Sequence, residues 1–442
     1  MDIATSWYNV LPDLPFELPP DLPSPRRGRG GVTLQVPVAL VRQEMDPRSR
    51  LPIPDEVLAR YRQWRPTPLR RAHAFERALG TACRIYYKYE GGNLGGSHKL
   101  NTAVAQAFYY RQAGTTCLTA GTGAGQWGTA VAAACAMFGM RCRVYMVRSS
   151  YEAKPYRRII MEALGATVVP SPSDRTDVGR RTRHDPCGSL SVALAEALED
   201  TDESGTRFCT GSGETYSLLH QTVVGLEAQE QLAALGESPD VVVGSLGAGS
   251  NFGGLALPFL GAMWNGGPRV HCVSVEPSAC PKLTRGRYAY DFTDESGLTP
   301  LQKMYTLGHR FKSPALHAGG LRYHGTAKLI SALYHEKLIG AAAHPQRAVF
   351  ASGLSFTRSE GILPAPESAH AVHGAVVEAR RADQENESRS ILVGISGHGL
   401  LDLAAYQSYL DGTMPDATAA DEDIADALAR LPEQPTAAPT SL

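Results

Sequence analysis

The chain has 442 residues, of which 43% are hydrophobic and 20% charged, and its formal net charge is -1. A chain of this length can bury more than one core, and its net charge gives no electrostatic reason to expect a nucleic-acid or membrane partner. The eight cysteines include no CxxC pair, so we expect reduced core thiols rather than a disulfide or zinc framework. With a polar N-terminus that predicts no signal peptide, these features favour a cytoplasmic protein.

Apolar runs of strand length alternate with helical segments along most of the chain. The predicted strands are 84–89, 116–119, 141–147, 167–170, 241–246, 269–275 and 391–396. The uncharged stretch 241–268 is long enough to suggest a membrane span, but its serine, asparagine and glycine residues divide it into a short strand and a helix. The pattern therefore predicts an α/β protein of two lobes, with mostly parallel sheets flanked by helices.

Composition also suggests where the parts of the chain begin and end. We expect a proline-rich arm at 1–65, an N-terminal lobe at 66–205, a C-terminal lobe at 206–414, and a terminal segment at 415–442. The terminal segment contains an acidic helix, 421–431, and a Pro/Thr/Ala-rich tail that is expected to be disordered. A polar Arg/Asp-rich insertion, 171–189, interrupts the N-terminal lobe.

Lys99 precedes apolar residues at positions 100, 104, 107 and 108, which recur at helical spacing. This pattern places the lysine amine in the first turn of a helix. The partial positive charge of a helix N-terminus favours a nearby phosphate and disfavours a protonated amine, so such a lysine can be a nucleophile toward an aldehyde. Considered alone, a lysine at a helix start is more often a solvated surface residue, and His98 beside it an ordinary loop histidine.

A glycine-rich turn follows the predicted strand 241–246. It consists of Gly247, Ala248, Gly249, Ser250 and Asn251, and an apolar helical segment follows it. Small residues let backbone N–H groups converge on an anion, and the serine and asparagine add side-chain donors and a potential N-cap, so the turn predicts a monophosphate cup. Two alternatives stay open. One is a purely structural turn, and the other is a dinucleotide site with Glu276 on the ribose, although Phe252 stands where that motif needs its third glycine.

Two more turns follow strand-like runs. The first comprises Gly121, Thr122, Gly123, Ala124, Gly125, Gln126 and Trp127 and offers an anion site suited to a carboxylate. The second contains Ser396, whose hydroxyl can donate to a neutral pyridine nitrogen, although a simple turn serine is the alternative. A nucleophilic lysine, a phosphate cup and a carboxylate loop together indicate pyridoxal phosphate and an amino acid.

Ordered motifs extend over nearly the whole chain. They include Trp7-Tyr8-Asn9, Arg65-Pro66-Thr67-Pro68-Leu69, Tyr87-Lys88-Tyr89-Glu90-Gly91, Gly96-Ser97-His98-Lys99, Gly123-Ala124-Gly125-Gln126-Trp127-Gly128, Lys154-Pro155-Tyr156-Arg157-Arg158, Leu219-His220-Gln221-Thr222, the segments 317–325 and 360–367, and Ser396-Gly397-His398-Gly399. On these motifs the chain resembles the tryptophan synthase β chains of the second, stand-alone type.

The resemblance implies a fold type II enzyme with pyridoxal 5'-phosphate bound as a Schiff base to Lys99. His98 and residues 247–251 would lie near the phosphate, Ser396 at the pyridine nitrogen, and Glu360 on the cofactor side. Residues 121–127 would bind the substrate and hold its carboxylate. Lys99 would be the catalytic base that removes the α proton and returns one, and a serine at the pyridine nitrogen favours β-elimination and β-replacement over transamination.

The resemblance also implies how the protein assembles and moves. Segment 115–200 would be a mobile subdomain that closes over the substrate. The partners would be a small-molecule amino acid and a nucleophile, the assembly a homodimer without an obligatory α subunit, and no nucleic acid or membrane would take part. A monovalent cation is expected at a site that the sequence does not locate, and no other metal is expected.

One residue departs from the family pattern. The resemblance implies a glutamate at position 121 that assists loss of the serine hydroxyl and orients indole, whereas this chain has Gly121. Assistance by a positioned acid contributes roughly a hundred- to ten-thousand-fold in rate, so serine hydroxide is expected to leave poorly unless another acid acts. Glu90 and Glu360 are the candidates for that acid, each with a structural or cofactor-side role as the alternative.

The expected reaction is therefore β-elimination and β-replacement on serine or a serine-like amino acid, with L-serine and indole giving L-tryptophan as the family reaction. Loss of the glutamate predicts an altered leaving group or nucleophile. A non-indole nucleophile in specialised metabolism, an amino-acid dehydratase or deaminase, and a catalytically weakened homologue that serves as a binding partner stay open as alternatives.

Overall fold

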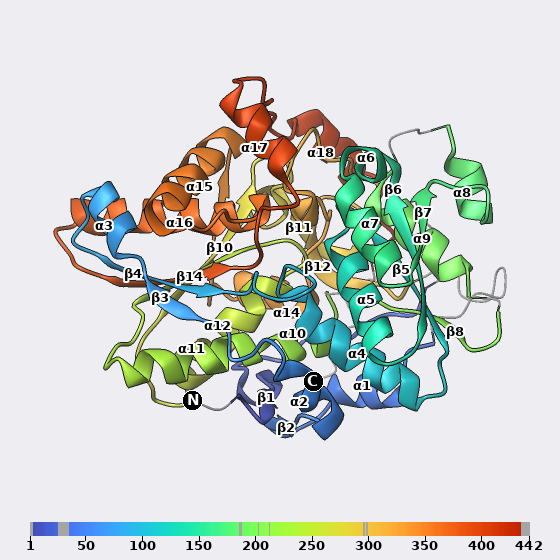
Figure 1. The fold of residues 1–442 in the computed structure, drawn as a ribbon, viewed down its shortest axis with the longest axis horizontal. Helices are drawn as coiled ribbons and strands as arrows, with labels where there is room; N and C mark the ends of the chain where they lie inside the picture. Colours follow the sequence, from blue (N-terminus) through green and yellow to red (C-terminus); the bar gives the residue numbers. More distant parts are fainter. Residues whose placement is uncertain are drawn as a thin grey trace, which may run out of the picture.

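Two sheets dominate the computed structural model, which describes residues 3–434 except 25–34, 185–187, 202, 212, 295–296 and 298. The larger sheet has the order β13-β10-β9-β14-β4-β3, and the smaller has the order β7-β6-β5-β8 (Figure 1). All neighbouring strands in both sheets are parallel except β3 and β4. The predicted α/β architecture of two mostly parallel sheets flanked by helices is confirmed.

The strand bounds follow the apolar runs of the sequence closely. In the larger sheet the strands are β3 (Leu69–Arg71), β4 (Arg84–Tyr89), β9 (Val241–Ser245), β10 (His271–Pro277), β13 (Gly340–His344) and β14 (Ser390–Ile395). In the smaller sheet they are β5 (Cys117–Thr122), β6 (Arg141–Val147), β7 (Thr167–Ser171) and β8 (Thr206–Phe208). β3 and β4 lie within the stretch expected as the N-terminal lobe but pair with the larger sheet, so the two sheets are not two continuous halves of the chain.

Helices cover both faces of each sheet. Against the larger sheet pack α16 (Pro366–Gln384), which contacts α15 (Gln346–Glu360), and α12 (Ser250–Trp264), which contacts α10 (Thr215–Gln221) and α11 (Val223–Ala234). Against the smaller sheet pack α5 (Gln126–Met137) and α9 (Leu190–Glu199), which contact α7 (Pro155–Ala163) and α8 (Asp177–Thr182) respectively. Helix α4 (Lys99–Gln112) contacts both α5 and α10, so it joins the helices of the smaller sheet to those of the larger sheet (Figure 1).

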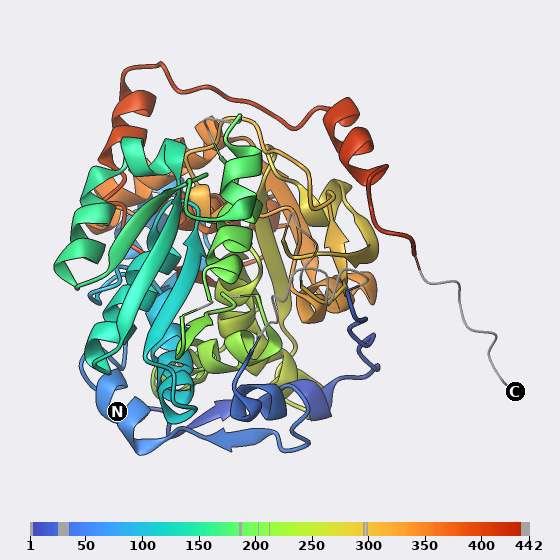
Figure 2. The same ribbon diagram turned by 90° about the vertical axis from the view of Figure 1, so that its right-hand side faces the viewer.

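Shorter elements surround these layers. They are β1 (Ser6–Tyr8) paired with β2 (Arg50–Pro52), the hairpin of β11 (Arg287–Asp291) and β12 (Gln302–Thr306), α1 (Val38–Gln43), α2 (Asp55–Tyr61), α3 (His73–Leu79), α6 (Arg148–Ala153), α13 (Lys282–Arg285), α14 (Lys328–His335), α17 (Leu403–Leu410) and α18 (Asp421–Leu428). Figure 2 shows the connection from α17 to α18 crossing the top of the molecule while β1 and β2 lie beneath it.

Three further predictions concern the cysteines, the C-terminal tail and the lengths of the apolar helices. Seven cysteines, at positions 83, 117, 135, 142, 209, 272 and 280, are buried and unbridged, and Cys187 lies outside the described residues. The tail at 435–442 also lies outside them. Within the described ranges, no helix is both long and apolar enough to cross a membrane.

Candidate active site

The candidate site lies where loops leave the carboxyl ends of parallel strands, the usual ligand position in α/β sheets. The loop after β4 is attached to the loop after β14, because the backbone N–H of His98 donates to the Ser396 carbonyl at 2.8 Å and that of His398 donates to the Gly96 carbonyl at 3.2 Å. The turn after β9 adjoins them through Ser250. The sheet thus brings together three of the segments that the sequence singled out.

Lys99 is the first residue of α4, as the sequence predicted. Its side chain lines a cavity of about 360 Å³, and no hydrogen bond or ion pair from the described residues reaches its Nζ. Burial lowers the pKa of the Lys99 ammonium, with the charge of Glu367 opposing this and that of Arg157 adding to it. An amine with a lowered pKa is more readily neutral, which is what nucleophilic attack requires.

His98 holds a defined orientation beside Lys99. Its Nδ1 lies 3.3 Å from the Ser396 carbonyl oxygen and its Nε2 lies 3.1 Å from Ser250 Oγ. Because a carbonyl only accepts, Nδ1 carries the proton and Nε2 accepts from the Ser250 hydroxyl. Burial, together with the neighbouring charge of Lys99, lowers the pKa of His98 to about 3, so the imidazole is neutral. It therefore fixes the loops without adding a second cation.

The turn from Gly247 to Asn251 ends β9 and begins α12. Its backbone fits only glycine at two positions, because a Cβ on Gly247 would lie 2.4 Å from the Gly320 carbonyl oxygen and Gly249 has a φ of +125°. The Asn251 amide donates back to the Ser245 carbonyl at 3.3 Å, so it braces the turn. The turn thus presents backbone N–H groups at the start of a 15-residue helix, an arrangement suited to a phosphate.

The second turn, which follows β5, faces the same cavity. Gly121 and Thr122, which the sequence placed in the turn, are the last two residues of β5, so this strand runs further than the predicted 116–119. They line the cavity together with Gly123, Ala124, Gln126 and Trp127. Gly125 has a φ of +99° and precedes the first residue of α5, and the Trp127 indole Nε1 is buried without a partner in the described part of the chain. Ala248 of the Gly247–Asn251 turn lines the same cavity, and the start of α5 has backbone donors suited to a carboxylate.

Ser396 is buried, and its hydroxyl lies 2.7 Å from the hydroxyl of Ser368 on α16. Ser368 also accepts from the backbone N–H of Gly397 at 3.1 Å. Ser368 therefore orients the Ser396 hydroxyl, a contact that the sequence did not reveal because the two serines lie on separate elements.

Glu367 is a site residue that was not among the predicted candidates. It is 4% exposed, its Oε1 accepts from the Gly320 backbone N–H at 2.7 Å, and its Oε2 is buried without a partner in the described residues. Its charge acts on Lys99. The available signal was an acid in the first turn of α16, directly after Pro364-Ala365-Pro366.

The sequence suggested Glu360, Glu276 and Glu90 as acids that could act in a site, but each of them binds other groups of the protein. Glu360 accepts from the backbone N–H of Phe75 at 2.8 Å, so the structure attaches it to α3 rather than to the Lys99 cavity. Glu276 accepts from the backbone N–H groups of Leu283 and Thr284 at 3.0 and 2.9 Å, so it braces α13 and is not free to bind a ribose.

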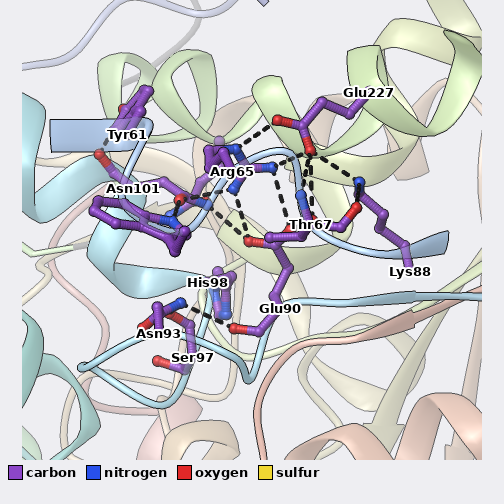
Figure 3. A network of polar contacts seen from close by, with 12 residues as sticks. Tyr61, Arg65, Thr67, Lys88, Glu90, Asn93, Ser97, His98, Asn101 and Glu227 are labelled. Atoms are coloured by element: carbon purple, nitrogen blue, oxygen red, sulfur yellow. Dashed lines mark hydrogen bonds and ion pairs between the residues drawn. The ribbon is translucent and has the colours of Figure 1, made fainter. Parts of the chain in front are cut away.

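Glu90 belongs to a buried polar network beneath α4 (Figure 3). Arg65 donates to Glu90 at 2.9 Å and to Glu227 at 2.8 Å, and Lys88 donates to Glu227 at 2.9 Å. The Asn101 amide on α4 donates to Glu90 at 3.1 Å. Although burial acts in the opposite direction, the charges of Arg65 and Lys88 lower the pKa of Glu90 to about 2, so it holds no proton to give. The network anchors the helix that carries Lys99.

Comparison with known proteins identifies the family of the chain. The model of the family described as pyridoxal-phosphate dependent enzyme matches residues 61–397. The tryptophan synthase beta chain 2 of Aeropyrum pernix is 49% identical over 426 residues, covering 94% of this chain and 95% of that protein. The chain belongs to the tryptophan synthase β family. The chain 2 proteins of Methanosarcina acetivorans and Aquifex aeolicus are each 48% identical, covering 93% and 94% of this chain and 95% and 98% of their own lengths.

This member of the tryptophan synthase β family is a pyridoxal-phosphate-dependent lyase, and its residues fit the cofactor. In the Gly247–Asn251 turn a Cβ on Gly247 would fill the space beside the backbone, the buried Glu367 Oε2 has no partner among the described residues, and the charge of Glu367 acts on Lys99. Lys99 would hold the aldehyde carbon, the turn the phosphate, and Ser396 the ring nitrogen.

Proposed function

We propose that the chain catalyses β-elimination and β-replacement on serine or a serine-like amino acid, with indole as the first acceptor to consider. The observation that carries this proposal is the position of Lys99, whose unpaired side chain lines one cavity together with Ala248 of the Gly247–Asn251 turn and with the glycine-rich segment that ends β5 and begins α5. When bound, the cofactor supplies an electron sink for the substrate α carbon.

The residues of the chain would divide the remaining work. The Lys99 amine would take the proton from the substrate α carbon and return one after the new bond forms. Backbone N–H groups of the 123–126 loop, at the start of α5, would hold the substrate carboxylate. Apolar side chains of α9 at the cavity wall would exclude water, which disfavours release of the product as a keto acid.

The proposal includes an altered leaving group or nucleophile. Gly121 offers no acid, and a side chain at this position would meet the backbone of α9, since its Cβ would lie 2.7 Å from atoms of Ala193 and Leu194. An amino acid with an activated β substituent, or a nucleophile other than indole, is the second candidate that this packing favours. A homodimer that acts without an α subunit, and a monovalent cation, remain part of the proposal.

The test is a titration of the cofactor-loaded protein with L-serine, O-acetyl-L-serine and O-phospho-L-serine, followed by absorbance spectroscopy and product analysis with indole. We expect a spectral change with at least one of these amino acids and tryptophan as the product. Pyruvate and ammonia as the sole products would instead assign a deaminase, and an unchanged spectrum with all three would assign a protein without this chemistry.

A further inference from the structure

Glu214 lines the same cavity as Lys99, and one of its two carboxyl oxygens has no hydrogen-bond donor among the described residues. It directly precedes α10, and its Oε2 accepts from the Gln302 amide at 3.2 Å. Its Oε1 makes no hydrogen bond to any residue that the structure describes. Glu214 is partly buried, so an oxygen that lies in the cavity wall and lacks a donor in this way is suited to a donor from a ligand.

The local charges do not supply that donor. Lys328 is the cation of this region, and its Nζ contacts Asp21 at 3.2 Å and Glu44 at 3.4 Å. Asp21 and Glu44 line the cavity as well. The Lys328 ammonium therefore pairs with Asp21 and Glu44, whereas Glu214 has no ion pair among the described residues.

The charge balance has a measurable consequence for Glu214. Burial raises its pKa to about 8, with the charges of Glu44 and Asp21 contributing and that of Lys328 opposing. The charge of Glu214 also acts on three phenols, those of Tyr110 on α4, Tyr216 on α10 and Tyr323 in the loop before α14, and Asp294 lines the same cavity. The group is held where a donor or a positive charge from a ligand would restore its ionised form.

An apolar wall is part of the same cavity. Leu190, Leu194 and Leu198 recur one helical turn apart on α9 and line the cavity together with Phe208. The close approach of α9 to Gly121 sets the position of this wall. The cavity therefore combines an apolar wall with a carboxyl oxygen that lacks a donor among the described residues, a combination that suits an apolar ring bearing an N–H.

We infer that Glu214 determines which acceptor binds, by accepting a hydrogen bond from the N–H of an aromatic nucleophile whose ring packs against the α9 leucines. This inference rests on the proposed function, because it assigns the acceptor of that reaction. Glu214 would take over the recognition of the ring N–H that no side chain at position 121 can provide. The acceptor class is then an N–H-bearing aromatic compound, rather than a thiol or a simple alcohol.

The experiment measures binding by isothermal titration calorimetry, using cofactor-loaded protein with indole and with indene, which has the same ring size without the N–H. The variants are Glu214→Leu and Glu214→Gln, and the matched control is Glu237→Gln, a glutamate paired with Arg84 away from the cavity. At pH 9, above the pKa of about 8 at which Glu214 ionises, we expect Glu214→Leu to raise the indole Kd about ten- to hundred-fold, as for loss of a hydrogen bond to a charged group. The indene Kd should stay within about twofold, and the control should match the wild type.

Two results would overturn the inference: equal weakening of indole and indene in Glu214→Leu, or no change in either. Failure of the wild type to bind indole would also overturn it. The titration with serine and its derivatives tests the proposed function independently of Glu214. Suppose that the wild type binds indole and that Glu214→Leu weakens the binding of indole but not of indene, while no amino acid changes the spectrum of the wild type. That result would refute the proposed function but support the role of Glu214 in binding indole.

Discussion

Replacing Gly121 with alanine tests how tightly α9 closes the cavity. The new Cβ would lie 2.7 Å from the carbonyl carbon and oxygen of Ala193 and from the nitrogen of Leu194. All three are backbone atoms, so no side-chain rotation can relieve the contact, and α9 must shift away from β5. Forcing one methyl group into well-packed structure typically costs about 1–3 kcal/mol.

The assay is urea unfolding followed by circular dichroism, with Gly123→Ala as the matched control. A Cβ on Gly123 would meet the Gly319 carbonyl oxygen at 3.5 Å, an ordinary contact. We expect Gly121→Ala to lower the unfolding midpoint clearly more than Gly123→Ala does. We also expect Gly121→Glu to destabilise the protein rather than to restore serine turnover. Equal midpoints for Gly121→Ala and the wild type would refute the close approach of α9.

Three further outcomes follow from the network, the ring-nitrogen contact and the buried acid. Arg65→Met leaves the buried Glu90 without its ion-pair partner and Glu227 with Lys88 alone, and should cost about 3–5 kcal/mol in the free energy of unfolding, measured with urea; an unchanged midpoint would argue against the network. Ser396→Ala should keep the cofactor, as judged by absorbance, while slowing the spectral response to serine, and an identical rate would exclude the ring contact. Because the pKa of Glu214 is raised to about 8, its contribution should lower the stability as pH rises from about 4.5 to about 8. Glu214→Gln should flatten that slope, and an unaltered slope would contradict the assignment.

The sequence predicted the elements that rest on local patterns. The apolar runs at 84–89 and 141–147 are β4 and β6 with the same bounds, and the glycine turn after β9 occurs where expected, whereas β5 extends to Thr122 and includes Gly121, the first residue of the other predicted turn. The helix that starts at Lys99 is likewise correct. Local periodicity decides these features, because strand and helix patterns need only near neighbours in the chain.

Contacts between distant segments were not predictable in the same way. Glu90 and Glu360 were both plausible acids in the sequence, but Arg65 occupies the first and the backbone of Phe75 the second. Glu367 and Glu214 gained their places only through partners far along the chain, Gly320 and Gln302. A carboxylate carries no local mark of whether its partner is a cation, a helix end or a cavity.

The role of Lys99 can be tested directly by finding which lysine binds the cofactor. The protein loaded with pyridoxal phosphate is reduced with sodium borohydride and digested, and the modified peptide is identified by mass spectrometry. Two other buried lysines act as internal controls, because Lys88 pairs with Glu227 and Lys282 donates to the carbonyls of Leu246 and Leu321. We expect the pyridoxyl mass on Lys99 alone. Modification of Lys88 or Lys282 in its place, or no modified lysine, would contradict it.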